Sequence, residues 1–226
     1  MSADWPPARL SDMRIPKVGW VVTTVLCLVM AAVSARYFTF DPKVFFDKQR
    51  AVYSAHEVVL GTHIAGATVA IVTGPWQFVG RLRRRFPRLH RCLGVTYLVS
   101  CLVAGIGALL LAPMAYGGPI AGFGFAALAV CWLMTGGIAL RMARAGRFAD
   151  HRRWMIRSFA LTFAAVTLRA MVAVAQLAHL DFTVSYVAAA WLCWLPNLAL
   201  AWWFTRIPAR PAGAPAPVTE PAALRR

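Results

Sequence analysis

Four residues in this chain combine a reactive or charged side chain with apolar surroundings: His63, His90, His151 and Arg169. A neutral imidazole can ligate haem iron or another metal through one ring nitrogen. A guanidinium inside an apolar helix is costly and normally has a partner or a function. We therefore take these four as candidate cofactor-binding residues, with haem b as the candidate cofactor, and we assign no catalytic residue.

His63 lies on a helical stripe of mostly small residues. Positions three, four or seven apart share one helix face, and this face carries His56, His63, Ala67, Ala70, Gly74 and Gln77. Small residues at such spacing let another helix backbone approach closely, which is the structural interpretation. The same clearance would admit a planar cofactor with His63 as an axial ligand, which is the alternative.

His90 and His151 each stand where an arginine-rich segment gives way to an apolar run. The structural interpretation makes them boundary residues at the starts of two helices. The alternative places the two imidazoles face to face on one iron or another metal. His63 cannot share their site, because roughly 16 helical residues, or about 24 Å, separate it from His90.

Arg169 stands inside a long apolar run, with Gln176 one heptad further on the same face. A structural interpretation pairs it with Glu57 or with backbone carbonyls. A functional one gives it an anion, such as a haem propionate, a quinone oxygen, or a lipid or substrate carboxylate. Depth and face predict an outward-facing polar pocket lined by His63, Arg169, Gln176 and Glu57.

Membrane-spanning helices must position these residues. The 226-residue chain is 60% hydrophobic with a mean hydropathy of +0.61, whereas soluble domains have about 45–50% apolar residues. Apolar runs of about 20 residues span a bilayer as helices, which predicts an all-α protein with six transmembrane helices in one bundle. The predicted spans are residues 18–40, 56–79, 92–112, 120–140, 154–178 and 183–205, between an N-terminal segment over 1–17 and a disordered tail over 206–226.

The first apolar run has a second interpretation. A basic start, a shorter apolar core and the sequence Val33-Ser34-Ala35 could mark a cleavable signal peptide. The run is long for a signal core, so we expect a spanning helix.

The net charge of +16 is distributed unevenly along the chain. Most Lys and Arg fall before the first span, over 81–91, over 141–157 and in the tail, whereas few lie over 36–50. By the positive-inside rule, we expect both termini in the cytoplasm and the protein in the bacterial inner membrane. The basic turns are expected to bind anionic lipid headgroups. Topology explains the charge better than nucleic-acid binding does.

Three segments in order carry a family resemblance: HIAGATVAIVTGPWQF, RFPRLHRCLGVTYL and DHRRWMIRSFALTFAAVTLR. Over roughly residues 63–169, the chain resembles a family of bacterial membrane proteins known only as domain of unknown function 2306. The resemblance implies a multi-pass membrane protein and no particular activity. The positions it highlights are His63, Gln77, His90, Arg91, Gly94, His151, Arg152, Arg157 and Arg169.

The chain also resembles, more loosely, the two-haem transmembrane b-type cytochromes, whose six helices bind haem through histidine pairs near each membrane face. His90 and His151, on the third and fifth helices, match one such pair. The fourth helix has no histidine to pair with His63, unless His179 substitutes. This departure counts against a two-haem carrier and leaves a one-haem protein open.

Three functional hypotheses follow. The first is a membrane redox protein that binds haem b and meets a redox partner. The second is a transporter or permease for a small anionic solute. Against it, the chain lacks an obvious broken helix, where transport sites often sit, apart from Pro196 and the Gly136-Gly137 pair. The third is a structural or accessory subunit without a small-molecule ligand. A second copy of the chain, in a homo-oligomer, is a candidate partner under any of the three. Whether the protein is an enzyme stays open, although phosphate-loop, zinc-protease and serine-hydrolase motifs are missing.

Overall fold

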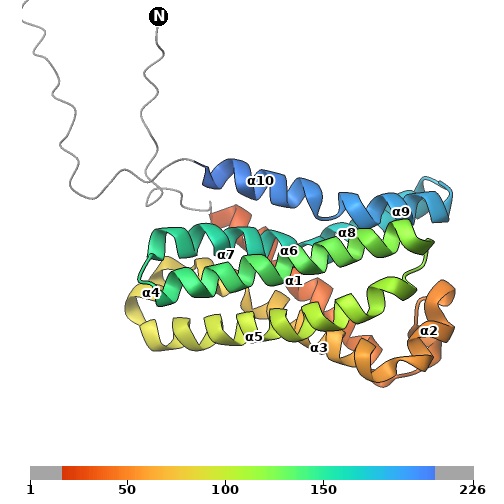
Figure 1. Ribbon diagram of the computed structural model, residues 1–226, viewed down its shortest axis with the longest axis horizontal. Coiled ribbons are helices and arrows are strands. Elements are labelled where there is room, and N and C mark those ends of the chain that lie inside the picture. Colours follow the sequence, from red (N-terminus) through yellow and green to blue (C-terminus); the bar gives the residue numbers. More distant parts are fainter. Residues whose placement is uncertain (1–16, 207–226) are drawn as a thin grey trace, which may run out of the picture.

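The computed structural model describes residues 17–206, and this part of the chain is all-α, without a β-strand. The predicted N-terminal segment and disordered tail lie outside the described residues, apart from Lys17 and Arg206. Six helical segments are long and apolar enough to cross a membrane: Lys17–Thr39, Glu57–Phe78, Pro87–Met114, Gly118–Arg144, Phe148–Leu177 and Phe182–Thr205. They pack together along the long axis of the molecule (Figure 1), so the predicted six-helix membrane bundle is confirmed.

The described helices have the following bounds. The α-helices are α1 (Lys17–Ala35), α2 (Arg50–Ala55), α3 (Glu57–Thr73), α4 (Gly80–Arg85), α5 (Pro87–Leu111), α6 (Gly118–Arg144), α7 (Phe148–Thr162), α8 (Ala164–Leu177), α9 (Phe182–Leu192) and α10 (Leu195–Thr205). Short 3-10 turns connect them: η1 (Arg36–Thr39), η2 (Pro42–Val44), η3 (Asp47–Gln49), η4 (Pro75–Phe78) and η5 (Ala112–Met114).

Helices α3 and α5 approach each other closely because small residues line their contact. A Cβ atom built on Gly66 would lie 2.8 Å from the backbone oxygen of Ser100 and 2.9 Å from the backbone nitrogen of Ala104. A Cβ on Gly107 would lie 3.0 Å from the Cβ of His63. The structural interpretation of the small-residue stripe is therefore confirmed, since α5 fills the clearance that a planar cofactor would need.

A buried polar network joins α5, α6 and α7 in the core of the bundle. The fully buried Tyr97 hydroxyl lies 3.0 Å from the Ser158 hydroxyl and 2.8 Å from the Thr162 hydroxyl. Trp132 donates its indole N–H to the Thr162 hydroxyl at 2.9 Å. Inside a membrane, polar groups must find partners within the protein. The network supplies them and so favours one register among the three helices.

Two spans are interrupted along their length. The fifth changes from α7 to α8 at Phe163, and the sixth changes from α9 to α10 around Cys193, just before Pro196. The Asn197 amide donates to the Cys193 carbonyl and to the Thr167 hydroxyl, each at 3.0 Å. The sequence marks Pro196 as a candidate interruption, whereas nothing at Phe163 is a helix breaker. Helix α6 continues through the Gly136-Gly137 pair.

The segment between α3 and α5 is largely helical where the sequence suggests an arginine turn. Helix α4 covers most of it, and α5 begins at Pro87 rather than at Cys92. Pro87 suits the first turn of a helix, where its missing N–H is not needed. His90 is consequently the fourth residue of α5, as His151 is the fourth residue of α7.

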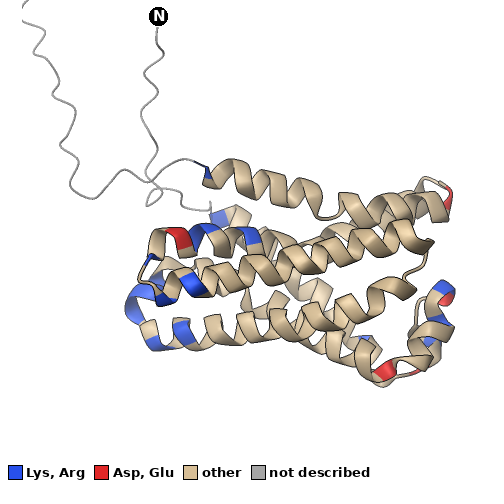
Figure 2. Cartoon of the chain, viewed as in Figure 1, with Lys and Arg blue, Asp and Glu red and all other residues tan. Residues whose placement is uncertain are grey.

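The two ends of the bundle differ in their charged residues. Lys and Arg gather where α4 and the starts of α5 and α7 lie, and the middle of the bundle carries little charge (Figure 2). We call this the arginine-rich end. At the other end, residues 36–55 fold over the helices: Phe46 packs against Tyr116 and Tyr186, and Gln49 donates to the Met114 carbonyl at 3.1 Å. We call this the covered end, and we call residues 36–55 the covering segment.

Candidate ligand cavity

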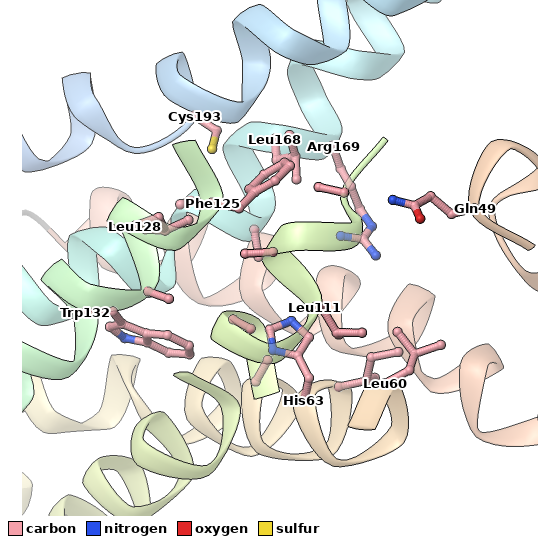
Figure 3. Close-up of a pocket in the computed structure, with 18 of the residues that line it drawn as sticks. Gln49, Leu60, His63, Leu111, Phe125, Leu128, Trp132, Leu168, Arg169 and Cys193 are labelled. Atoms are coloured by element: carbon pink, nitrogen blue, oxygen red, sulfur yellow. The ribbon is translucent and has the colours of Figure 1, made fainter. Parts of the chain in front are cut away.

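A cavity of about 260 Å³ lies between the covering segment and the helices α3, α5, α6 and α8. It extends from Gln49 at the covered end to Trp132 in the core (Figure 3). Much of its wall is apolar, formed by side chains such as Leu60, Leu111, Phe125, Leu128 and Leu168. Its polar lining includes Tyr37, Gln49, Tyr53, His63, Arg169 and Tyr186.

Arg169 is the charged residue of this lining. Its guanidinium points into the space between Gln49 and His63 (Figure 3). The side chain is exposed, and it is among the residues that line the cavity. Among residues 17–206, no hydrogen bond or ion pair holds it. Its nearest electrostatic partners are the phenols of Tyr37, Tyr53 and Tyr186, so its charge is not neutralised by a carboxylate.

His63 presents one ring nitrogen to the cavity. Its Nδ1 lies 2.8 Å from the backbone carbonyl oxygen of Ala104 on α5. Because a carbonyl can only accept, Nδ1 carries the proton and Nε2 is left as an acceptor. The contact with α5 fixes the ring and leaves Nε2 to meet a ligand, as a donor-anchored histidine does in metal sites.

The predicted outward-facing pocket is partly assembled. The structure brings His63 and Arg169 to one cavity, although they lie on different spans. Gln176 and Glu57 do not line it. Gln176 is exposed near the end of α8, and the structural pairing of Arg169 with Glu57 is also not formed. Whether His63 and Arg169 bind a cofactor stays a prediction.

The covering segment supplies cavity residues that sequence reasoning missed. Tyr37, Gln49 and Tyr53 all belong to it, and Tyr186 comes from α9. The signal was available, because this stretch is rich in aromatic residues for a charged loop. Burial raises the pKa of the Tyr53 phenol, so it stays a neutral hydrogen-bond donor.

At the arginine-rich end, the structure places His90 and His151 near each other. His151 lies within electrostatic range of His90, as does Arg83. The Nδ1–H of His151 donates to the Ala139 carbonyl at 2.9 Å. The Nδ1 of His90 is buried and has no hydrogen-bond partner among the described residues. That the two imidazoles share one iron stays a prediction.

Arg157 shows how this bundle holds an arginine for structural purposes. It is 7% exposed, and its guanidinium carbon lies 3.7 Å from the Trp202 ring centroid and 4.6 Å from that of Trp154. Its Nε donates to the Thr205 hydroxyl at 3.1 Å. Stacking on two indoles stabilises a guanidinium by cation–π attraction. Arg157 therefore joins α7 to the end of α10.

The cavity does not fit haem. Its volume of about 260 Å³ is below the range of about 300–1,000 Å³ for sites of drug-sized ligands, and haem is a larger ligand. His63 is the single histidine among the described residues that line it. Helix α5 lies directly against α3 at Gly66 and Gly107, so a haem has no room between these two helices.

Comparison with known proteins identifies a family. The family model described as Predicted membrane protein (DUF2306) matches residues 60–205. No curated protein and no solved structure matches the chain. The matched segment contains His63, His90, His151 and Arg169, and the family description carries no activity that could be assigned to them.

Proposed function

Because the chain belongs to the family of predicted membrane proteins with domain of unknown function 2306, we propose its function from the geometry of its cavity. We infer that the protein binds a small anionic solute with an apolar tail, as the binding step of a transporter or permease. The charge distribution supports an orientation in the bacterial inner membrane with both termini in the cytoplasm. The cavity then opens toward the periplasmic side.

The observation that carries the proposal is the unneutralised charge of Arg169. No Asp or Glu is among the described residues that line the cavity. Arg36, the other charged group in electrostatic range, is also a cation. A cation in apolar surroundings gains most from an anionic partner that forms charge-assisted hydrogen bonds. A carboxylate or sulfonate beside Arg169 would supply this partner, and the phenols of Tyr53 and Tyr186 would supply further donors.

The shape of the cavity favours an amphipathic solute over a fully polar one. Beyond Arg169 and His63, the lining continues through Leu128 to Trp132 and is mainly apolar. An apolar tail there would leave water at about 25 cal/mol per Å² of buried surface. A fully polar solute would leave its groups without partners.

The helix interruptions support a transport role. Thr162 and Ala164, which flank the break between α7 and α8, line the cavity, and so does Cys193 at the break between α9 and α10. Transporters commonly place their sites at discontinuous helices near the bilayer midplane. Here both interruptions adjoin the same cavity, so a shift of either half-helix would change its shape.

Binding can be tested with three hexyl probes that differ only in their head. Hexanesulfonate, hexanol and hexylamine are titrated by calorimetry against the protein in lipid nanodiscs. We expect hexanesulfonate alone to bind saturably. Arg169→Gln should weaken it by at least about tenfold, the effect of losing a hydrogen bond to a charged group. Arg50→Gln is the matched control, because Arg50 lies at the same end outside the cavity and pairs with Asp47.

Equal binding of the three probes would contradict the proposal, as would unchanged sulfonate binding in Arg169→Gln. Transport is measured separately as uptake of labelled hexanesulfonate into proteoliposomes, since a permanent anion crosses bare lipid slowly. Uptake that requires Arg169 would support a permease. Binding without uptake would favour a sensor or accessory subunit instead.

A further inference from the structure

Two buried nitrogen atoms at the arginine-rich end have no hydrogen-bond partner among the described residues: Nε2 of Gln77 and Nδ1 of His90. Leaving a buried polar group unpaired costs about 1–3 kcal/mol, so such groups usually meet a ligand, an ion or water. We propose that Gln77, His90 and Arg83 form a binding site for a phosphate group.

The two nitrogen atoms come from neighbouring elements that face each other. Gln77 lies on η4 and is 7% exposed. A Cβ built on Gly94 of α5 would lie 3.1 Å from the Gln77 Oε1, so the amide lies against Gly94. His90 and Gly94 are four residues apart and share one face of α5. The Gln77 Oε1 therefore lies one helical turn of α5 from His90, and the missing side chain of Gly94 makes room for it.

The electrostatics of this space favour an anion. Arg83 and His151 are within electrostatic range of His90, and Arg83 is within range of Arg152. The carboxylate nearest along α7, Asp150, already pairs with Arg147 and Arg153. The helices α5 and α7 both begin at this end, and the N-terminus of a helix attracts negative charge. A metal cation is disfavoured, because these neighbouring groups are cationic.

The arrangement of donors fits a phosphate group. A phosphate has several acceptor oxygens that can be reached from different sides, and it matches guanidinium groups well. Gln77, Arg83 and His90 belong to three different elements, η4, α4 and α5, so their donors could reach different oxygens of one phosphate. The site lies at a membrane edge, where anionic lipid headgroups are concentrated. The phosphate could belong to such a headgroup or to free phosphate, and the two sources are distinguishable.

The test measures ligand-dependent rises in the thermal unfolding midpoint of the full chain in neutral detergent. Three ligands are titrated: inorganic phosphate, dioctanoyl phosphatidylglycerol and dioctanoyl phosphatidylcholine. We expect a saturable rise with phosphate, with phosphatidylglycerol or with both, and none with phosphatidylcholine. Gln77→Leu should raise the half-saturating concentration by about tenfold. Because it removes an unpaired buried amide, it should fold at least as well as the natural chain.

Charge-matched variants separate a specific site from general attraction. Arg83→Gln should weaken binding as strongly as Gln77→Leu. Arg88→Gln removes the same charge from an exposed position in the same region and should leave binding nearly unchanged. Equal effects of Arg83→Gln and Arg88→Gln, or an unchanged midpoint shift in Gln77→Leu, would overturn the site. Saturation by phosphatidylglycerol alone assigns it to a lipid, and saturation by inorganic phosphate alone assigns it to the free anion. Arg169→Gln should affect none of these titrations, which keeps this site separate from the cavity.

Discussion

Arg157 and Arg169 belong to the same span but have opposite environments. Arg157 on α7 is stacked between two tryptophan rings and donates to Thr205. Arg169 on α8 faces a cavity and has no ion pair or hydrogen bond within residues 17–206. A membrane protein can retain a cation within its bundle if it supplies partners or if a ligand does. Arg157 has such partners within the chain, and the absence of described partners at Arg169 is what motivates the binding proposal.

The two ends of the bundle differ in a related way. The covered end uses aromatic rings to enclose an apolar cavity around a single guanidinium. The arginine-rich end groups several cations around two buried nitrogen atoms that lack described partners. No Asp or Glu is among the described residues that line the cavity, and the groups that act on His90 are Arg83 and His151. Both proposals therefore concern anions, and the cavity proposal concerns one with an apolar tail.

The largest expected effect is the loss of stability in Arg157→Ala. This change removes the cation–π contacts with Trp154 and Trp202 and the hydrogen bond to Thr205. We expect the free energy of unfolding to fall by about 3 kcal/mol. Denaturant titration of the purified protein measures it. Arg157→Lys, which keeps the charge but not the planar stacking group, should show an intermediate loss. If Arg157→Ala is as stable as the natural chain, the two arginines do not differ as described.

The effect of Arg169→Gln on stability should have the opposite sign. In the absence of ligand, the change removes an unneutralised charge from apolar surroundings. We expect the free energy of unfolding to rise by about 1 kcal/mol, as is common when a functional group is removed. The same denaturant titration applies. A loss comparable to that of Arg157→Ala would mean that Arg169 has a structural partner and would contradict the binding proposal.

A smaller effect is expected on the affinity for hexanesulfonate, where two tyrosines beside the covering segment should differ. Tyr186 lines the cavity, whereas the Tyr116 hydroxyl lies 2.8 Å from the Thr183 hydroxyl, outside the cavity. Tyr186→Phe should weaken hexanesulfonate binding by about fivefold, because one neutral donor to the sulfonate is lost while the ionic contact with Arg169 remains. Tyr116→Phe should leave binding unchanged. Calorimetric titration in nanodiscs measures both affinities. Equal affinities for the two variants would mean that the Tyr186 phenol does not contact the bound sulfonate.

The last prediction concerns visible absorbance, where we expect no signal from haem. Since the cavity does not fit haem and the arginine-rich end favours an anion, we expect no b-type reduced-minus-oxidised spectrum from cells well supplied with haem. The measurement includes His90→Ala and His151→Ala beside the natural chain. A b-type spectrum that both variants lose would assign the pair to haem, and would overturn the phosphate site at His90.

Much of the architecture was predictable because apolar length and charge are properties of the chain itself. The six spans follow from runs of about 20 apolar residues. That another helix packs closely on α3 follows from the small residues on one face of it, such as Gly66 and Ala70. The arginine-rich end follows from where Arg residues fall between spans. Depth and helix face also predicted that His63 and Arg169 could meet, and both line one cavity.

Other features were decided by the tertiary structure, because periodicity does not give the order of helices around a bundle. Only the folded chain shows that α5 fills the space beside His63, that Phe163 interrupts a span, and that residues 36–55 close the cavity. The same holds for the Gln77 amide, which lies against Gly94, one turn from His90, although His90 is 13 positions further along the chain than Gln77. The sequence by itself determined which helices form and where charge lies. Packing decided which polar groups obtained partners, as Arg157 did, and which have none among the described residues, as for Arg169.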